Sequence, residues 1–115
     1  MDYMHDLAEQ VKLWRDALED EDKFIQYVLY EDGGDLVDAL DKFLNEDILD
    51  IYFIVGLDCK VREVGVLVAF GGPNVYVKTD GTNVTVEGYW GGHSYTTQGR
   101  DNIGLFDYLR ELYAC

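Results

Sequence analysis

The residues best suited to nucleophilic catalysis in this chain are a single serine, Ser94, and two histidines, His5 and His93. A catalytic serine needs a base within hydrogen-bond reach. Ser94 directly follows His93, and neighbouring side chains of an extended segment point to opposite faces. The chain also lacks the Gly-x-Ser-x-Gly elbow. We therefore expect no enzyme, and keep a small catalytic or ligand-binding site near His93, Ser94 and Trp90 as an alternative.

Metal and phosphate sites also have recognisable spacings, and the sequence contains none of them. The zinc motifs Cys-x-x-Cys, His-x-x-x-His and His-Glu-x-x-His are missing, as is the calcium-loop spacing Asp-x-Asp-x-Asp-Gly. The acidic run at residues 19–22 is typical of a solvated helix junction. Gly71-Gly72 and Gly91-Gly92 are typical of turns and not of phosphate-binding loops. We expect no cofactor and no metal.

The distinctive feature of the sequence is its acidity. The 115 residues include 23 acidic and 9 basic side chains, a formal net charge of −14. Residues 1–50 hold 16 acids against four bases, and residues 51–115 hold seven acids against five bases. This charge repels nucleic acid and anionic membranes. It also exceeds the magnitude of about 2–8 that keeps a small domain soluble, which favours binding to a basic protein over a plain acidic surface.

Part of this acid lies in one row on a predicted amphipathic helix, residues 3–18. The apolar face recurs every three or four residues. It consists of Tyr3, Leu7, Val11, Trp14 and Leu18. The opposite sector holds Asp2, Asp6, Glu9, Asp16 and Asp20. A helical rise of about 1.5 Å per residue spaces these acids about 6, 4.5, 10.5 and 6 Å apart along the axis, comparable with successive phosphates of a nucleic-acid strand. Leu13 falls inside the row, so we expect it to be exposed.

Two more helices are predicted before residue 48. Asp20 or Asp22 can cap the second, which buries Phe24 and Val28 and ends at Gly33-Gly34. Asp35 caps the third, which runs to about Asn45. These helices extend the acidic surface. The residues that we predict to bind a partner are Asp2, Asp6, Glu9, Asp16, Asp20, Glu21, Asp22, Glu31 and Asp32.

From residue 48 the hydrophobic period changes from that of helices to the alternation of strands. Residues 49–55 are rich in β-branched and aromatic side chains, and valines alternate through residues 64–70, 75–77 and 84–86. Turn residues separate these segments at 71–74 and 80–83. We expect Tyr89 and Trp90 to open a loop, and residues 94–97 to form a short edge strand. Asp101 caps a final helix, whose predicted apolar face is Leu105, Phe106, Leu109, Leu112 and Tyr113.

Together these elements predict an α+β fold in a single domain, residues 1–115. Residues 1–47 form the acidic helical part. Residues 48–115 form an antiparallel meander of four to five strands and a carboxy-terminal helix packed on it. Aromatic side chains beside acids, such as Tyr30, or in a glycine-rich segment, such as Tyr89 and Trp90, are candidates for an interface.

The chain carries no predicted targeting or membrane-spanning segment. Its amino terminus has neither a basic region nor an apolar stretch, and no apolar run approaches the roughly 20 residues that span a bilayer. Cys59 and Cys115 are too few for a disulfide framework and predict free thiols in a reducing cytosol. We therefore expect a cytoplasmic protein, and the sequence leaves its oligomeric state open.

Short acidic proteins without catalytic motifs occur among the inhibitors carried by phages and plasmids, and this chain resembles their anti-CRISPR and antirestriction class. The segment GGPNVYVKTDGTNVTVEGYWGG, residues 71–92, is also similar to stretches of mobile-element proteins. The resemblance implies an inhibitor that imitates nucleic acid and occupies the basic RNA- or DNA-binding groove of a Cas9-type nuclease. It supplies no site residue. An immunity or antitoxin protein that neutralises a basic toxin is an alternative with the same physical basis.

Overall fold

The structure is a computed structural model that describes residues 3–30 and 34–113. Its helical elements before the sheet are α1 (Tyr3–Glu19), α2 (Glu21–Leu29), α3 (Leu36–Lys42) and a π-helical turn, η1 (Phe43–Asp47). The strands are β1 (Asp50–Val55), β2 (Val61–Ala69), β3 (Asn74–Thr79), β4 (Asn83–Trp90) and β5 (His93–Arg100), and α4 (Leu105–Arg110) follows them. The predicted α+β class and order of elements are confirmed.

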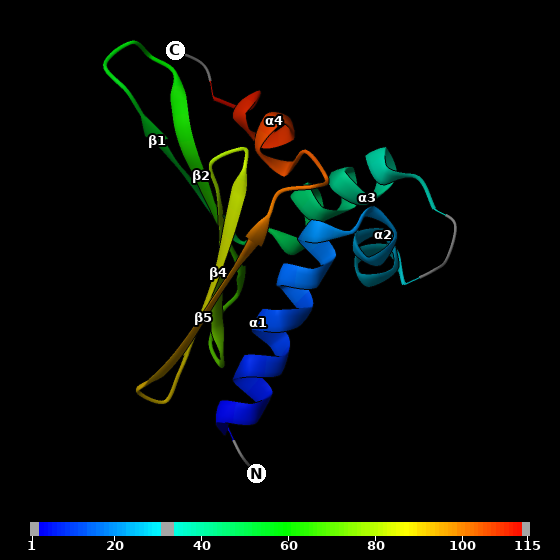
Figure 1. The fold of residues 1–115 in the computed structure, drawn as a ribbon, viewed down its shortest axis with the longest axis vertical. Coiled ribbons are helices and arrows are strands. Elements are labelled where there is room, and N and C mark those ends of the chain that lie inside the picture. The colour runs from blue at the N-terminus through cyan, green and yellow to red at the C-terminus, as the bar shows by residue number, and fades with distance from the viewer. Residues whose placement is uncertain (1–2, 31–33, 114–115) are drawn as a thin grey trace.

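The sheet is an antiparallel meander in the order β1-β2-β3-β4-β5, and the helices lie along one side of it (Figure 1). Its register places Val66 beside Val77 and Val77 beside Val86. All three are buried, because alternation sends every second side chain of a strand to the helix-covered face. The valine pattern of the sequence therefore marks the inner face of the sheet.

Helix α1 lies across β4 and β5 and buries Leu7 and Val11 against them. A Cβ added at Gly88 of β4 would come within 2.6 Å of Leu7 Cδ1 and of Val11 Cγ2. Real Cβ atoms do not approach so closely, so the missing side chain of Gly88 lets α1 seat directly on the strand. This close packing holds the outer, acidic side of α1 toward solvent.

An aromatic cluster joins α1 to α2 and η1. The ring of Trp14 lies 4.7 Å from that of Tyr27 and 5.5 Å from that of Phe43, measured between centroids. Phe24 packs edge-on against Phe43 at 5.6 Å. Both phenylalanines are fully buried. The two short helices therefore owe their positions to this shared core, because helices of seven to nine residues are not stable alone.

Several boundaries differ from the predictions. The second helix ends at Tyr30, whose φ of 60° is left-handed, and not at Gly33-Gly34. Strand β5 spans eight residues where a short edge strand was expected, because Gly91 and Gly92 make a tight turn that pairs Trp90 with His93. Tyr89 and Trp90 thus end a strand and do not open a loop. The third predicted helix stops at Lys42 and continues as η1.

The carboxy-terminal helix is shorter than predicted. Leu105 and Leu109 are fully buried, but α4 ends at Arg110 and leaves Leu112 49% exposed and Tyr113 36% exposed. The N-cap position of α4 is Gly104, which lies three residues after Asp101. The carboxylate of Asp101 accepts hydrogen bonds from the backbone N–H groups of Leu105 and Phe106, so Asp101 caps the helix as predicted, but not from the N-cap position.

The prediction of free thiols is wrong for Cys59, which is disulfide-bonded in the structure. The one other cysteine of the sequence, Cys115, lies outside the described residues. Cys59 therefore gives no indication of a reducing cytosol. Among the described residues, no helix combines the length and the apolar character needed to cross a membrane.

Candidate functional site

The amino-terminal part of the acidic row is presented to solvent by α1. Asp6 and Glu9 are exposed, on the side of the helix away from the buried Leu7 and Val11. Neither carboxylate makes an ion pair with any residue that the structure describes. Leu13, one turn further along, is 45% exposed, as predicted. This stretch of α1 is a negative surface that no described cation neutralises.

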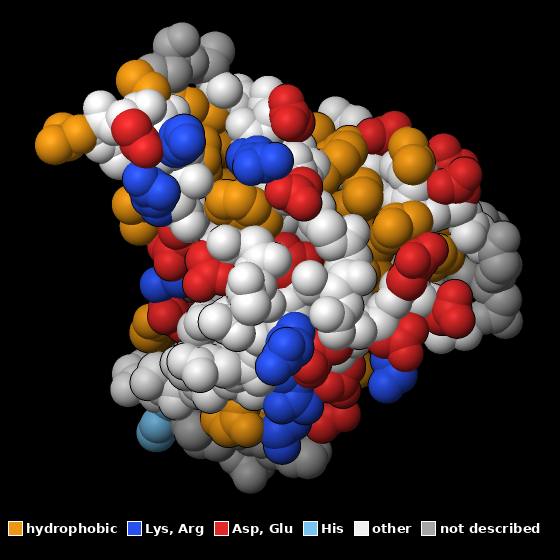
Figure 2. Space-filling model, turned by 45° about the horizontal axis from the view of Figure 1, so that its top comes forward, with side chains coloured by type: hydrophobic (Ala, Val, Ile, Leu, Met, Phe, Trp, Pro, Cys, Tyr) orange, Lys and Arg blue, Asp and Glu red, His pale blue; other side chains and the backbone are white. Residues whose placement is uncertain are grey.

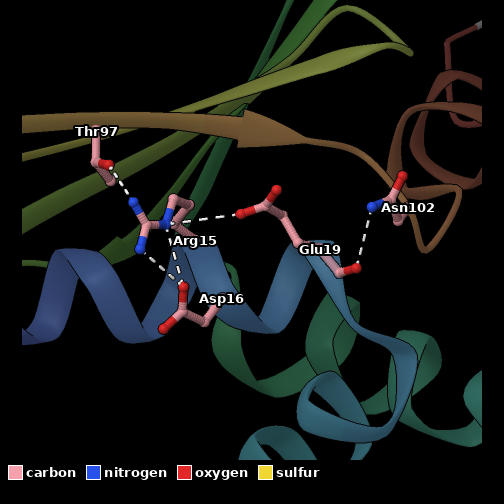
Figure 3. A network of polar contacts seen from close by, with 5 residues as sticks. All are labelled: Arg15, Asp16, Glu19, Thr97 and Asn102. Carbon is pink, nitrogen blue, oxygen red and sulfur yellow. Dashed lines mark hydrogen bonds and ion pairs between the residues drawn. The ribbon is translucent and has the colours of Figure 1, made fainter.

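Asp16 is different, because Arg15 engages it. The Arg15 guanidinium donates to Asp16 Oδ1 from Nε at 3.1 Å and from Nη2 at 2.9 Å, and it donates from Nη1 to Thr97 Oγ1 at 3.0 Å (Figure 3). The Glu19 carboxylate also lies 3.7 Å from Arg15 Nε. The guanidinium of Arg15 thus pairs with two acids of its own helix, Asp16 and Glu19. Because Arg15 partly neutralises it, Asp16 adds less negative potential to the surface than the sequence predicted.

Asp20 leaves the helical row altogether. Helix α1 ends at Glu19, and Asp20 has an extended backbone with φ of −138° and ψ of 115°. Its carboxylate accepts hydrogen bonds from the N–H groups of Asp22 at 2.9 Å and Lys23 at 3.3 Å, which makes it the N-cap of α2. The last step of the predicted axial spacing is therefore wrong, since it assumed a helix continuing through Asp20.

The remaining predicted acids divide into two groups. Glu21 and Asp22 are exposed in the first turn of α2, and their carboxylates have no ion-pair partner among the described residues. Asp2, Glu31 and Asp32 lie outside the described residues. The structure thus leaves four predicted acids, Asp6, Glu9, Glu21 and Asp22, exposed and without a described cation.

Other acids of the helical part are used within the fold. Asp35 caps α3 by accepting from Val37 N at 2.7 Å, and Asp41 accepts a short hydrogen bond from the Tyr108 hydroxyl. Asp47 lies 3.8 Å from Lys42 Nζ. Burial raises the pKa of the Asp47 carboxyl, and the nearby Lys42 opposes this shift. These three acids therefore each have a described hydrogen-bond or ion-pair partner within the fold.

A groove between α1 and α2 lies beside these acids, and sequence patterns did not predict it. It has a volume of about 630 Å³. Its lining residues are Leu13, Asp16, Ala17, Lys23, Gln26, Tyr27 and Tyr30. The exposure predicted for Leu13 and Tyr30 was the signal for it, but only the pairing of the two helices brings them together.

The space-filling view shows how charge is distributed on one face of the protein. Acidic side chains spread over the side that carries the helices, with hydrophobic side chains between them (Figure 2). Basic side chains gather in a few separate places. The helical side of this face therefore carries negative charge together with apolar contact area.

The residues of the alternative site near His93 do not line either of the two described cavities. His93 and Ser94 are exposed at the start of β5, and Trp90 is half-buried at the end of β4. None of the three lines the groove or a second cavity of about 490 Å³ beside Cys59 and Arg110. Among the described residues, no three His, Cys, Asp or Glu side chains are arranged to hold a metal ion.

Comparison of the chain with protein-family models, with curated proteins and with solved structures found no match. The geometry of the acidic helical surface is therefore what a functional proposal has to rest on.

Proposed function

We propose that this protein is a non-catalytic inhibitor whose acidic helical surface docks on the basic nucleic-acid groove of a nuclease. The observation that carries the proposal is the set of exposed acids Asp6, Glu9, Glu21 and Asp22, which no described cation neutralises. They belong to the helical part, residues 1–47, in which acids outnumber bases by 15 to four. Holding such charge together opposes folding through self-repulsion, so a binding role explains why it is kept.

A basic groove is the physical complement of this surface. It holds Lys and Arg side chains that bind phosphates, and a row of carboxylates can take the place of those phosphates and release the same counterions. Opposite charges also steer the two proteins together, which raises the association rate by about 10- to 1,000-fold at low salt. Binding to the nuclease is therefore expected to weaken steeply as salt rises.

The partner that we propose is a Cas9-type effector or its guide-RNA complex. This choice follows the resemblance to anti-CRISPR proteins, and the charge argument holds for any nuclease with a basic groove. An immunity protein against a basic toxin nuclease would use the same carboxylates. Inhibition of a cognate toxin, with no effect on Cas9-type enzymes, would select that alternative.

The test is a DNA cleavage assay with purified Cas9-type nucleases and the full chain. We expect the variant Asp6→Lys/Glu9→Lys/Asp22→Lys to raise the concentration needed for half-inhibition at least tenfold, about 1.4 kcal/mol of binding free energy. A matched control, Asp50→Lys/Asp107→Lys/Glu111→Lys, makes the same change in net charge at exposed acids outside the helical part. We expect it to lose less than about threefold.

Two results would contradict the proposal. If the unmodified chain inhibits no nuclease, the function is wrong. If the two triple variants lose potency equally, net charge alone acts and the acids of the helical part have no special role.

A further inference from the structure

The groove between α1 and α2 has a size and lining suited to side chains of a partner. Its volume of about 630 Å³ falls within the range of about 300–1,000 Å³ typical of binding sites. Ala17 is buried at its base, and Tyr27 is half-buried against Trp14. The groove is therefore a depression over the aromatic core, with an apolar base already in place.

Two large side chains on its rim are exposed to solvent. Leu13 is 45% exposed and Tyr30 is 84% exposed. Tyr30 occupies the left-handed C-cap of α2, a position that Gly or Asn adopts at less cost. Neither side chain is needed to fill the core of the described structure. Lys42 Nζ lies 5.5 Å from the centroid of the Tyr30 ring, and both side chains still leave apolar surface open to a second molecule.

Charge defines what that molecule must look like. On the surface of α1, Leu13 has Glu9 one turn before it and Asp16 one turn after it. Among the described contacts, Arg15 uses only Oδ1 of Asp16, so Oδ2 of this groove-lining carboxylate is available. Lys23 is the one base of the lining. The exposed Glu21 and Asp22 precede it, so the four acids beside the groove outnumber its two neighbouring bases, Lys23 and the Lys42 that lies over the Tyr30 ring.

We infer that this groove takes an amphipathic helix of a basic partner, with apolar side chains entering between Leu13 and Tyr30 and flanking Lys or Arg side chains meeting Glu9 and Asp16. A groove between two helices accepts a third through apolar residues spaced three or four apart. The inference rests on the proposed function, because it names the part of the basic partner that anchors the complex. Charge then brings the partner in, and the groove holds it.

The test uses the ¹⁵N-labelled full chain and two synthetic helical peptides of about 18 residues. One carries Leu on one face and Lys on the other, and the second has every Leu replaced by Ala at unchanged charge. We expect the Leu/Lys peptide to shift the amide resonances of Ala17, Lys23 and Tyr27 and to bind at least tenfold more tightly than the Ala/Lys peptide.

Matched variants locate the contact. Leu13→Ala/Tyr30→Asn removes both rim side chains and keeps a residue that tolerates the left-handed backbone at position 30. We expect it to weaken the Leu/Lys peptide about tenfold. The control Leu57→Ala/Phe70→Ala removes two exposed apolar side chains, 108% and 74% exposed, from loops of the sheet part and should leave affinity unchanged. Thermal unfolding of both variants checks that the fold is intact.

Three outcomes would overturn the inference. Equal affinity for the two peptides would mean that charge alone binds them. Equal loss in the two double variants would place the contact elsewhere. Concentration-dependent shifts of the same amides without peptide, with a dimer in sedimentation, would assign the groove to a second copy of the chain. These results do not depend on nuclease inhibition, so failure of the groove and failure of the proposed function are distinguishable.

Discussion

The helical part and the sheet part of this protein differ in the balance between acidic and basic side chains. In the sheet part, residues 48–115, eight acids face five bases, and Lys78, Arg62 and Arg110 each pair with an acid nearby. Lys78 Nζ, for example, lies 3.0 Å from Glu87 Oε1 on the neighbouring strand. In the helical part, Arg15 and Lys42 pair locally, and an exposed acidic surface is left over.

This difference separates the parts by role. The sheet part pairs most of its bases with nearby acids, whereas the helical part holds surplus acids that no described cation pairs. The aromatic cluster around Phe43 links the two, because η1 leads directly into β1. Substitutions in that cluster should therefore lower the free energy of unfolding, and substitutions on the exposed acidic surface should weaken binding.

The largest effect on stability is expected from Phe43→Ala. Phe43 is fully buried and contacts the rings of Trp14 and Phe24, so truncation leaves a cavity and costs about 3–5 kcal/mol of unfolding free energy. Urea denaturation followed by circular dichroism measures this loss. The control Phe70→Ala, at a position 74% exposed in the sheet part, should change the free energy by less than about 0.5 kcal/mol. Two separate transitions in the wild type would break the picture of a shared core.

Removing one helix cap from each part should cause a loss of unfolding free energy smaller than that of Phe43→Ala. Asp101 is part-buried and accepts from Leu105 N, Phe106 N and the Thr79 hydroxyl, so Asp101→Ala should cost about 2 kcal/mol. Asp20 is exposed and accepts from two N–H groups, so Asp20→Ala should cost about 1 kcal/mol. Paired urea melts measure both losses. Equal costs would show that burial and the Thr79 contact add nothing.

The smallest effect concerns the hydrogen bond that joins α4 to α3. The Tyr108 hydroxyl donates to Asp41, and this bond, aided by burial, raises the pKa of Tyr108 to about 12. An elevated folded-state pKa adds stability below the unfolded value near 10, and this contribution disappears as pH rises from about 10 to 12. Burial also raises the pKa of Tyr27 and Tyr52, and a hydrogen bond to Glu87 raises that of Tyr89, so the group to follow in an absorbance titration is the one that ionises near pH 12. Asp41→Asn should lower the pKa of that group, and Tyr108→Phe should remove it from the titration; an ionisation near pH 12 that survives Tyr108→Phe would reject the assignment.

Local patterns predicted most of the fold because each has a local cause. The apolar spacing of Leu7, Val11 and Trp14 places them on the inner side of α1, and alternating valines mark the inner face of the sheet. The errors concern places where a tertiary contact competes with local preference. Tyr30 adopts a left-handed backbone three residues before Gly33, where the helix was predicted to end, and Gly91-Gly92 extends a hairpin whose second strand is largely polar.

The acids of the candidate site were predictable as a set, but their individual states were not. Spacing alone put Asp6, Glu9, Asp16 and Asp20 in one row. It could not reveal that Arg15 would turn toward Asp16 while reaching Thr97, 82 residues away in the chain. Nor could it reveal the groove, whose walls come from two helices.

The sequence by itself determined the class of fold, the asymmetry of charge and the exposure of Leu13, because periodicity and composition act residue by residue. Tertiary structure alone decided which carboxylates are neutralised or used as caps, and which apolar side chains meet beside them. The physical reason is that ion pairs and grooves depend on distances of a few ångströms between elements, and only packing sets those distances.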